Sequence, residues 1–206
     1  MKFIRTLFLL LIAATLAMAA GTGSITGKVS GIPAAKAAPG AFPPPPIPAV
    51  VYAVPEPDKT APAPTGAFMV DQKYTEFTPS ISAVPEGATV TFKNEDTVNH
   101  NVELFAANGT LLKDLGTHPP DQSVTYKVTK AGPIHLKCKI HPGMSGWLYV
   151  TPSQYFTTTK SNGSYALDNL PAGKYRVVVW QPDAVQQEQV VTVAGSVNLN
   201  FKLKKK

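Results

Sequence analysis

The sequence predicts an all-β protein that contains two β-sandwiches. Short segments rich in valine, isoleucine, threonine and aromatic residues alternate with turns that contain glycine, proline, asparagine or aspartate. Beyond the first twenty residues, no segment sustains the apolar period of an amphipathic helix. About eight short strands between residues 68 and 151 are enough for one sandwich of two packed sheets. Further β-rich segments before and after that range predict a second sandwich.

The expected strands lie between these turns. In the middle region they are 68–72, 80–84, 89–93, 101–105, 111–115, 123–128, 134–139 and 147–150. In the last part they are 165–167, 174–180, 190–193 and 197–201, and we expect the final two to pair with each other across residues 194–196.

The strands expected at 24–31 and 49–54 are too few to form a domain alone. We therefore expect them to complete the C-terminal strands, with the middle region inserted between the two halves. Proline-rich runs at 39–48 and 55–64 cannot supply a regular ladder of sheet hydrogen bonds and are expected to be loops or spacers.

The first twenty residues have the pattern of a secretory signal peptide. Two basic residues precede an apolar run from Leu7 to Leu16, which is too short to span a membrane, and small residues follow it. We expect cleavage near Ala19 or Ala20 and a periplasmic or secreted protein. No later segment is long and apolar enough to predict an integral membrane span.

Charge argues against one class of partner. The formal net charge is +6, but no basic stripe with interleaved aromatic residues is present, so we expect no nucleic-acid partner. The three lysines at 204–206 are expected to be a solvated tail.

The most informative cluster surrounds the single cysteine of the chain. Cys138 is followed by His141 and Met144, each three residues after the last. Thiolate, imidazole and thioether groups together suit copper, and two histidines, one cysteine and a weak axial methionine are the ligands of blue-copper sites. His100, at the start of a predicted strand, is the candidate for the second histidine. Since a lone exposed thiol oxidises in an oxidising compartment, Cys138 is expected to be buried or metal-bound.

Residues 68–151 resemble the cupredoxin family. The match is carried by His100-Asn101-Val102 and by the spacing of Cys138, His141 and Met144, which is similar to the short ligand loop of amicyanin-like members. The resemblance implies a Greek-key β-sandwich with one copper ion bound by His100, Cys138, His141 and Met144. Asn101 is expected to link the ligand loops through its side chain or backbone amide. Ile140 stands where the family often has proline.

The flanking regions resemble the carboxypeptidase regulatory-like family, a transthyretin-like and carbohydrate-binding-like β-sandwich. The resemblance is carried by residues 27–29, 161–165 and 170–177. The expected organisation is therefore a signal peptide at 1–20, a discontinuous flanking domain at 21–66 and 152–206, and a cupredoxin domain at 67–151. This combination is similar to exported bacterial proteins often labelled methylamine utilisation proteins.

Five other residues of types that occur in functional sites are expected to have structural roles. We expect His118 to lie in a surface loop and His135 to pack or face solvent on the strand that leads to the cysteine. Met69 is expected in the core, and Trp147 and Trp180 in the core or at an interface.

The leading functional hypothesis is a one-electron carrier that cycles between Cu(II) and Cu(I), not an enzyme. A redox protein is the expected partner, docking near His141. The alternative is a non-redox copper-binding module, or an assembly module whose flanking sandwich binds a glycan or protein; carbohydrate is the less favoured ligand. Copper catalysis is disfavoured because the chain has four histidines and no His-x-His pair for a second copper centre.

Overall fold

The computed structural model describes residues 22–33, 47–57 and 64–206, which form seventeen β-strands and no helix. The expected signal peptide and most of the 39–48 proline run lie outside these residues. In chain order the strands are β1 (Thr22–Ser30), β2 (Val50–Glu56), β3 (Phe68–Lys73), β4 (Glu76–Thr78), β5 (Ile81–Pro85), β6 (Thr89–Asn94), β7 (His100–Ala106), β8 (Leu111–His118), β9 (Ser123–Lys127), β10 (Gly132–Lys137), β11 (Ser145–Thr151), β12 (Tyr155–Thr158), β13 (Ser164–Pro171), β14 (Gly173–Trp180), β15 (Gln187–Val193), β16 (Ser196–Asn198) and β17 (Phe201–Lys202).

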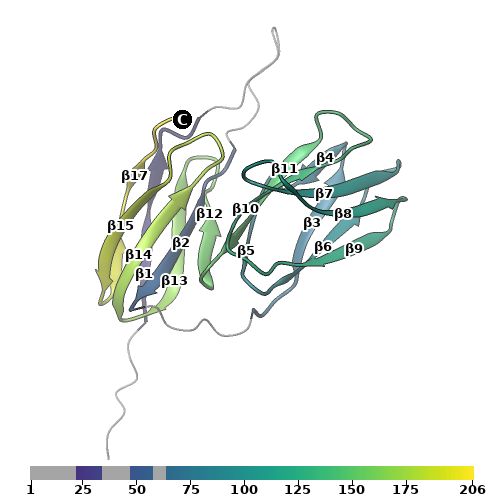
Figure 1. The fold of residues 1–206 in the computed structure, drawn as a ribbon. Coiled ribbons are helices and arrows are strands. Elements are labelled where there is room, and N and C mark those ends of the chain that lie inside the picture. Colours follow the sequence, from purple (N-terminus) through teal and green to yellow (C-terminus); the bar gives the residue numbers. More distant parts are fainter. Residues whose placement is uncertain (1–21, 34–46, 58–63) are drawn as a thin grey trace, which may run out of the picture.

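Strands β3 to β11 form the central sandwich (Figure 1). Its five-stranded sheet has the order β5-β11-β10-β7-β8, and its four-stranded sheet has the order β4-β3-β6-β9. Side chains alternate along each strand, so every second residue points between the sheets. Phe77, Phe92, Leu104, Leu136 and Leu148 fill this core with almost no exposure.

The remaining strands form the flanking sandwich. One sheet has the order β13-β1-β16, with β17 also paired to β1, and the other has the order β12-β2-β14-β15. Strand β1 therefore pairs with C-terminal strands, and β2 lies between β12 and β14. The expectation that the two early strands complete the C-terminal ones is confirmed, as is the all-β class with two sandwiches. The division into domains with the stated boundaries stays a prediction.

The two sandwiches meet through an aromatic interface. Trp180 on β14 packs its ring against Tyr149 and Trp147 on β11, with centroid distances of 4.7 and 5.6 Å. The hydroxyl groups of Tyr52 on β2 and Tyr149 lie 3.2 Å apart. Burial raises the pKa of Tyr149 far above its usual range, so this pair stays neutral. The prediction for both tryptophans is confirmed.

His135 also has the packing role expected of it. Its ring stacks on Trp147 at 4.3 Å between centroids, with 10° between the ring planes. It points away from the core of the central sandwich, because its neighbours Ile134 and Leu136 are the residues that point inward.

Two expectations about packing were wrong. Met69 is half exposed, because the alternation along β3 places its neighbour Val70 in the core instead. The segments 190–193 and 197–201 do not pair with each other. Strand β15 pairs with β14, whereas β16 pairs with β1 in the opposite sheet, so residues 194–196 carry the chain between sheets. The short strands β4 and β12 were not expected.

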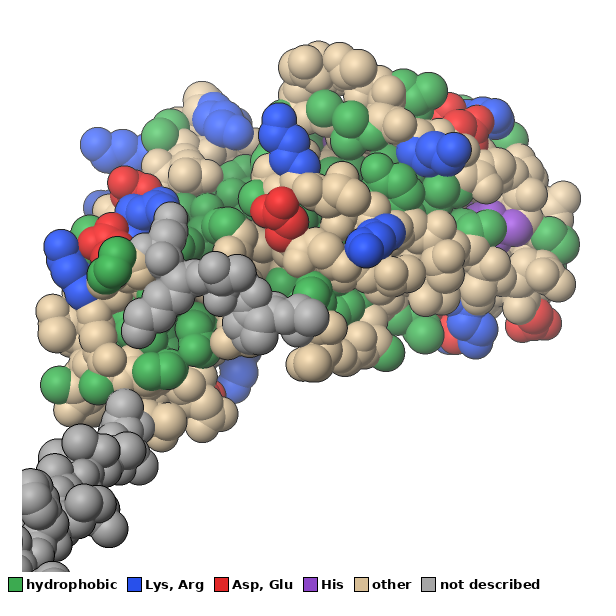
Figure 2. All heavy atoms as spheres, turned by 60° about the horizontal axis from the view of Figure 1, so that its bottom comes forward, with side chains coloured by type: hydrophobic (Ala, Val, Ile, Leu, Met, Phe, Trp, Pro, Cys, Tyr) green, Lys and Arg blue, Asp and Glu red, His purple; other side chains and the backbone are tan. Residues whose placement is uncertain are grey.

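Charged side chains are dispersed on the face shown in Figure 2, where lysine and arginine alternate with acidic, polar and apolar groups over both sandwiches. Some charged side chains of the protein form ion pairs, as Arg176 does with Glu56 and Glu188. Within the described part of the chain, no helix is long and apolar enough to cross a membrane.

Candidate metal centre

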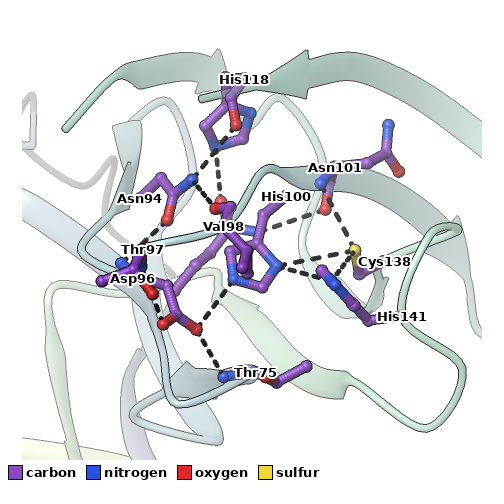
Figure 3. A network of polar contacts seen from close by, with 11 residues as sticks. Thr75, Asn94, Asp96, Thr97, Val98, His100, Asn101, His118, Cys138 and His141 are labelled. Carbon is purple, nitrogen blue, oxygen red and sulfur yellow. Dashed lines mark hydrogen bonds and ion pairs between the residues drawn. The ribbon is translucent and has the colours of Figure 1, made fainter. Parts of the chain in front are cut away.

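Three of the predicted site residues converge at one end of the central sandwich (Figure 3). His100 begins β7, Cys138 directly follows β10, and His141 lies in the loop between β10 and β11. The Nδ1 atoms of the two histidines are 3.0 Å apart, and Cys138 Sγ lies 3.9 Å from His100 Nδ1 and 3.6 Å from His141 Nδ1. Across residues 22–33, 47–57 and 64–206, this is the one group of histidine, cysteine or acidic side chains close enough to share a metal ion.

The size of this triangle suits a metal ion. Three atoms with these separations lie on a circle with a radius of about 2 Å, which is close to the bond lengths of a first-row metal to imidazole nitrogen and thiolate sulfur. One ion can therefore reach all three donors without rearrangement of the backbone.

The loop from Cys138 to Met144, here named the ligand loop after the predicted copper ligands in it, folds back on itself. The Cys138 N–H donates to the Met144 carbonyl at 3.2 Å, and the Met144 N–H donates to the His141 carbonyl at 3.1 Å. Gly143 takes a φ of +94°, which a residue with a side chain adopts only with strain, and so allows this tight return. Met144 and Cys138 are both buried in the same core cluster. The place of Met144 as a fourth ligand stays a prediction.

The His100 ring is oriented by Asp96, an acidic residue that was not among the predicted site residues. His100 is fully buried, and its Nε2 lies 3.1 Å from Asp96 Oδ2. The backbone N–H of Thr75, the His100 ring and the N–H of Thr97 all stabilise the carboxylate and lower the pKa of Asp96. An ionised carboxylate only accepts hydrogen bonds, so Nε2 carries the hydrogen and Nδ1 keeps its lone pair for a metal.

Asn101 makes three hydrogen bonds beside the cluster, and its role in support of a metal stays a prediction. Its backbone N–H points at Cys138 Sγ at 3.4 Å, and its side-chain Oδ1 accepts from the Lys139 N–H at 3.4 Å. Its Nδ2 donates to Asp114 Oδ1 at 2.8 Å. Strand β7, strand β8 and the ligand loop are thus connected through one buried side chain.

The expectation that His118 lies in a surface loop was wrong. Strand β8 continues to His118, which is only 4% exposed and faces His100 across the β7–β8 pair. Its Nε2 contacts Gln72 Oε1, and Gln72 Nε2 donates to the Asn101 carbonyl at 3.2 Å. Burial lowers the pKa of His118, which favours the neutral imidazole. The following prolines suggested a loop, but they begin only after this inward-facing residue.

Apolar side chains are exposed on the two segments that carry the histidines. Val98 is 44% exposed just before His100, and Ile140 is 42% exposed just before His141. His141 itself is half-buried, whereas His100 and Cys138 are buried. His141 is therefore the most accessible side chain of the cluster.

Comparisons with known proteins give one family model and several solved structures. Residues 148–204 match the family model of the carboxypeptidase regulatory-like domain. A purple cupredoxin from Nitrosopumilus maritimus is 21% identical over 41% of this chain and 99% of its own, with a TM-score of 0.38. An oxidised and a reduced variant of amicyanin are 24% and 26% identical, each over 48% of this chain and 99% of their own, with a TM-score of 0.38. No curated protein matches the chain.

Proposed function

We propose that this protein binds one copper ion, which His100, Cys138 and His141 would hold with Met144 as a fourth, weaker ligand. The observation that supports this most is the triangle of two imidazole nitrogens and one sulfur, 3.0 to 3.9 Å apart. A cysteine with two histidines and a methionine is the donor set that blue-copper sites use.

The choice of copper over zinc rests on the donors. Structural zinc sites have four strong cysteine, histidine or carboxylate ligands, and the cluster offers three such groups and no carboxylate. The fourth candidate is the thioether of Met144, a soft group that suits copper better than zinc.

We propose one-electron transfer as the role of the site. Bound copper would supply a reversible change between Cu(II) and Cu(I). The chain contributes a donor set fixed before the metal arrives: Asp96 orients His100, and backbone hydrogen bonds close the loop around Cys138 and Met144. Ligands that already lie in position need little reorganisation when the charge of the metal changes.

Partner docking near His141 is part of the same proposal. His141 is the most accessible of the three clustered side chains, and exposed Ile140 and Val98 lie on the adjoining segments. Small apolar patches of this kind suit the brief contacts of redox partners. We propose that the electron carrier is exported, because its first twenty residues have the pattern of a signal peptide. The proposed organisation is a cupredoxin region at 67–151 and a flanking domain at 21–66 and 152–206.

Redox cycling tests this function. The copper-loaded protein is titrated with a one-electron reductant and then with an oxidant while the thiolate-to-copper absorption is followed. We expect loss and full recovery of the band with one electron per copper. Irreversible bleaching, or copper that resists reduction, would contradict electron transfer while leaving copper binding intact.

A further inference from the structure

A β-bulge in β8 lies next to the metal centre. Asn101 pairs with Thr117 and Glu103 pairs with Asp114, so a single β7 residue between the first pair and the second faces two β8 residues. Gly116, one of those two, has a φ of +83°, the conformation that glycine supplies in many bulges. Bulges redirect the side chains around them, and this one adjoins Asp114.

The Asp114 carboxylate collects three donors from three segments. Oδ1 accepts from the Gly116 N–H and from Asn101 Nδ2, both at 2.8 Å, and Oδ2 pairs with Lys139 Nζ at 2.7 Å. Gly116 is part of the bulge, Asn101 follows the ligand His100, and Lys139 follows the ligand Cys138. One carboxylate therefore holds the two ligand-bearing segments in register.

Asn101 connects the Asp114 carboxylate to the Cys138 sulfur. Its backbone N–H is the donor to Cys138 Sγ, while its side chain is held from one side by Asp114 and from the other by the Lys139 N–H. The direction of the N–H toward the sulfur therefore depends on where Asp114 holds the side chain. Hydrogen bonds to a metal-bound sulfur stabilise its negative charge and tune the potential of the metal.

We propose that Asp114 is a positioning residue of the metal centre, which fixes Asn101 and Lys139 and so aims the Asn101 N–H at the Cys138 sulfur. This inference rests on the proposed function for its effect on copper, but its geometry is testable without metal. In this proposal Asp114 acts through its hydrogen bonds and not only through its negative charge. Variants of Asp114 separate the effect of the hydrogen bonds from the effect of the charge.

The variants Asp114→Ala and Asp114→Asn remove the same charge. The asparagine can still accept from Asn101 Nδ2 and Gly116, whereas the alanine cannot. Asp114→Ser keeps a hydroxyl for the Gly116 N–H but does not reach the other two donors, and it replaces the alanine if that variant misfolds. Glu103→Gln is the control for charge. Glu103 lies opposite Asp114, and its negative charge also raises the pKa of Lys139, but it makes none of these hydrogen bonds.

The first measurement is amide hydrogen exchange in the metal-free protein. We expect Asp114→Ala or Asp114→Ser to speed exchange at Asn101 and Lys139 about tenfold, the consequence of losing a hydrogen bond to a charged group. Asp114→Asn should change it much less and Glu103→Gln not at all. Unchanged exchange in the alanine and serine variants would overturn the proposal.

The second measurement is the reduction potential and the thiolate-to-copper absorption of the loaded protein. A positioning role predicts that the alanine variant shifts both further than the asparagine variant. Equal shifts in these two variants and in Glu103→Gln would assign the effect to charge alone and overturn the proposal. A wild-type protein with no such absorption would instead refute the proposed function, and the exchange result would stand apart from it.

Discussion

Replacing Asp96 by alanine tests how far copper binding depends on the orientation of His100. The carboxylate accepts from the His100 ring at 3.1 Å and from the Thr75 N–H at 2.8 Å, so it fixes both the ring and the tautomer. Without it, His100 Nδ1 carries the proton for part of the time and the ring loses its anchor. Removal of such a partner weakens metal binding about 10- to 100-fold, or about 1.4 to 2.8 kcal/mol.

The assay is a competition titration of Cu(I) against a chromophoric chelator, with nitrogen NMR of the metal-free protein to report the His100 tautomer. Glu95→Gln is the matched control, because the neighbouring Glu95 pairs with Lys93 and Lys73 but not with His100. Asp96→Asn keeps one acceptor oxygen and should lose less affinity than Asp96→Ala. If Asp96→Ala binds copper as tightly as the control and leaves the tautomer unchanged, the reasoning about this hydrogen bond is refuted.

Three further predictions concern the interface, the acid range and the fourth ligand. Trp180→Ala should lower the free energy of unfolding by about 3 to 5 kcal/mol, because it leaves a cavity at the interface between the sandwiches, and should leave the copper absorption unchanged. Urea denaturation measures the loss of stability, and a shifted absorption would contradict the independence of the interface from the copper site. The hydrogen bond from the Lys139 ammonium is the main cause that lowers the pKa of Asp114 to about 2. The unfolded chain therefore binds a proton at Asp114 more readily than the folded protein does. The contribution of Asp114 to the free energy of unfolding should be present above about pH 4 and be lost as the pH falls toward 2. Asp114→Ala should flatten that fall in denaturation curves measured at several pH values, and an equally steep fall would show that other groups cause it. Met144→Leu should cost less than about 1.5 kcal/mol of stability and raise the reduction potential, because Cu(II) loses a donor; voltammetry that shows no shift would remove Met144 from the ligand set.

The candidate ligands were accessible from the sequence because three of them share one short loop. The spacing of Cys138, His141 and Met144 is visible without knowledge of the fold, and His100 stands at a predicted strand start. The pairing of early with late strands also followed from the count of strands in each region.

The supporting residues were not accessible in the same way. Asp96 belongs to a turn whose sequence predicts only a break, and its contact with His100 depends on the path of that turn. Asp114 reaches the ligand loop because of a bulge that no local pattern predicts. His118 was misplaced because β8 runs three residues past its expected end at 115. Met69 was misplaced because it was assigned to the wrong face of a strand whose position was predicted correctly.

The most direct test of the account is the absorption spectrum of the metal-free protein after addition of one equivalent of Cu(II). We expect an intense thiolate-to-copper band toward the red end of the visible spectrum, saturating at one copper per chain and absent in Cys138→Ser. No such band in the wild-type protein, or the same spectrum in the Cys138→Ser variant, would contradict the assignment of a copper centre to His100, Cys138 and His141.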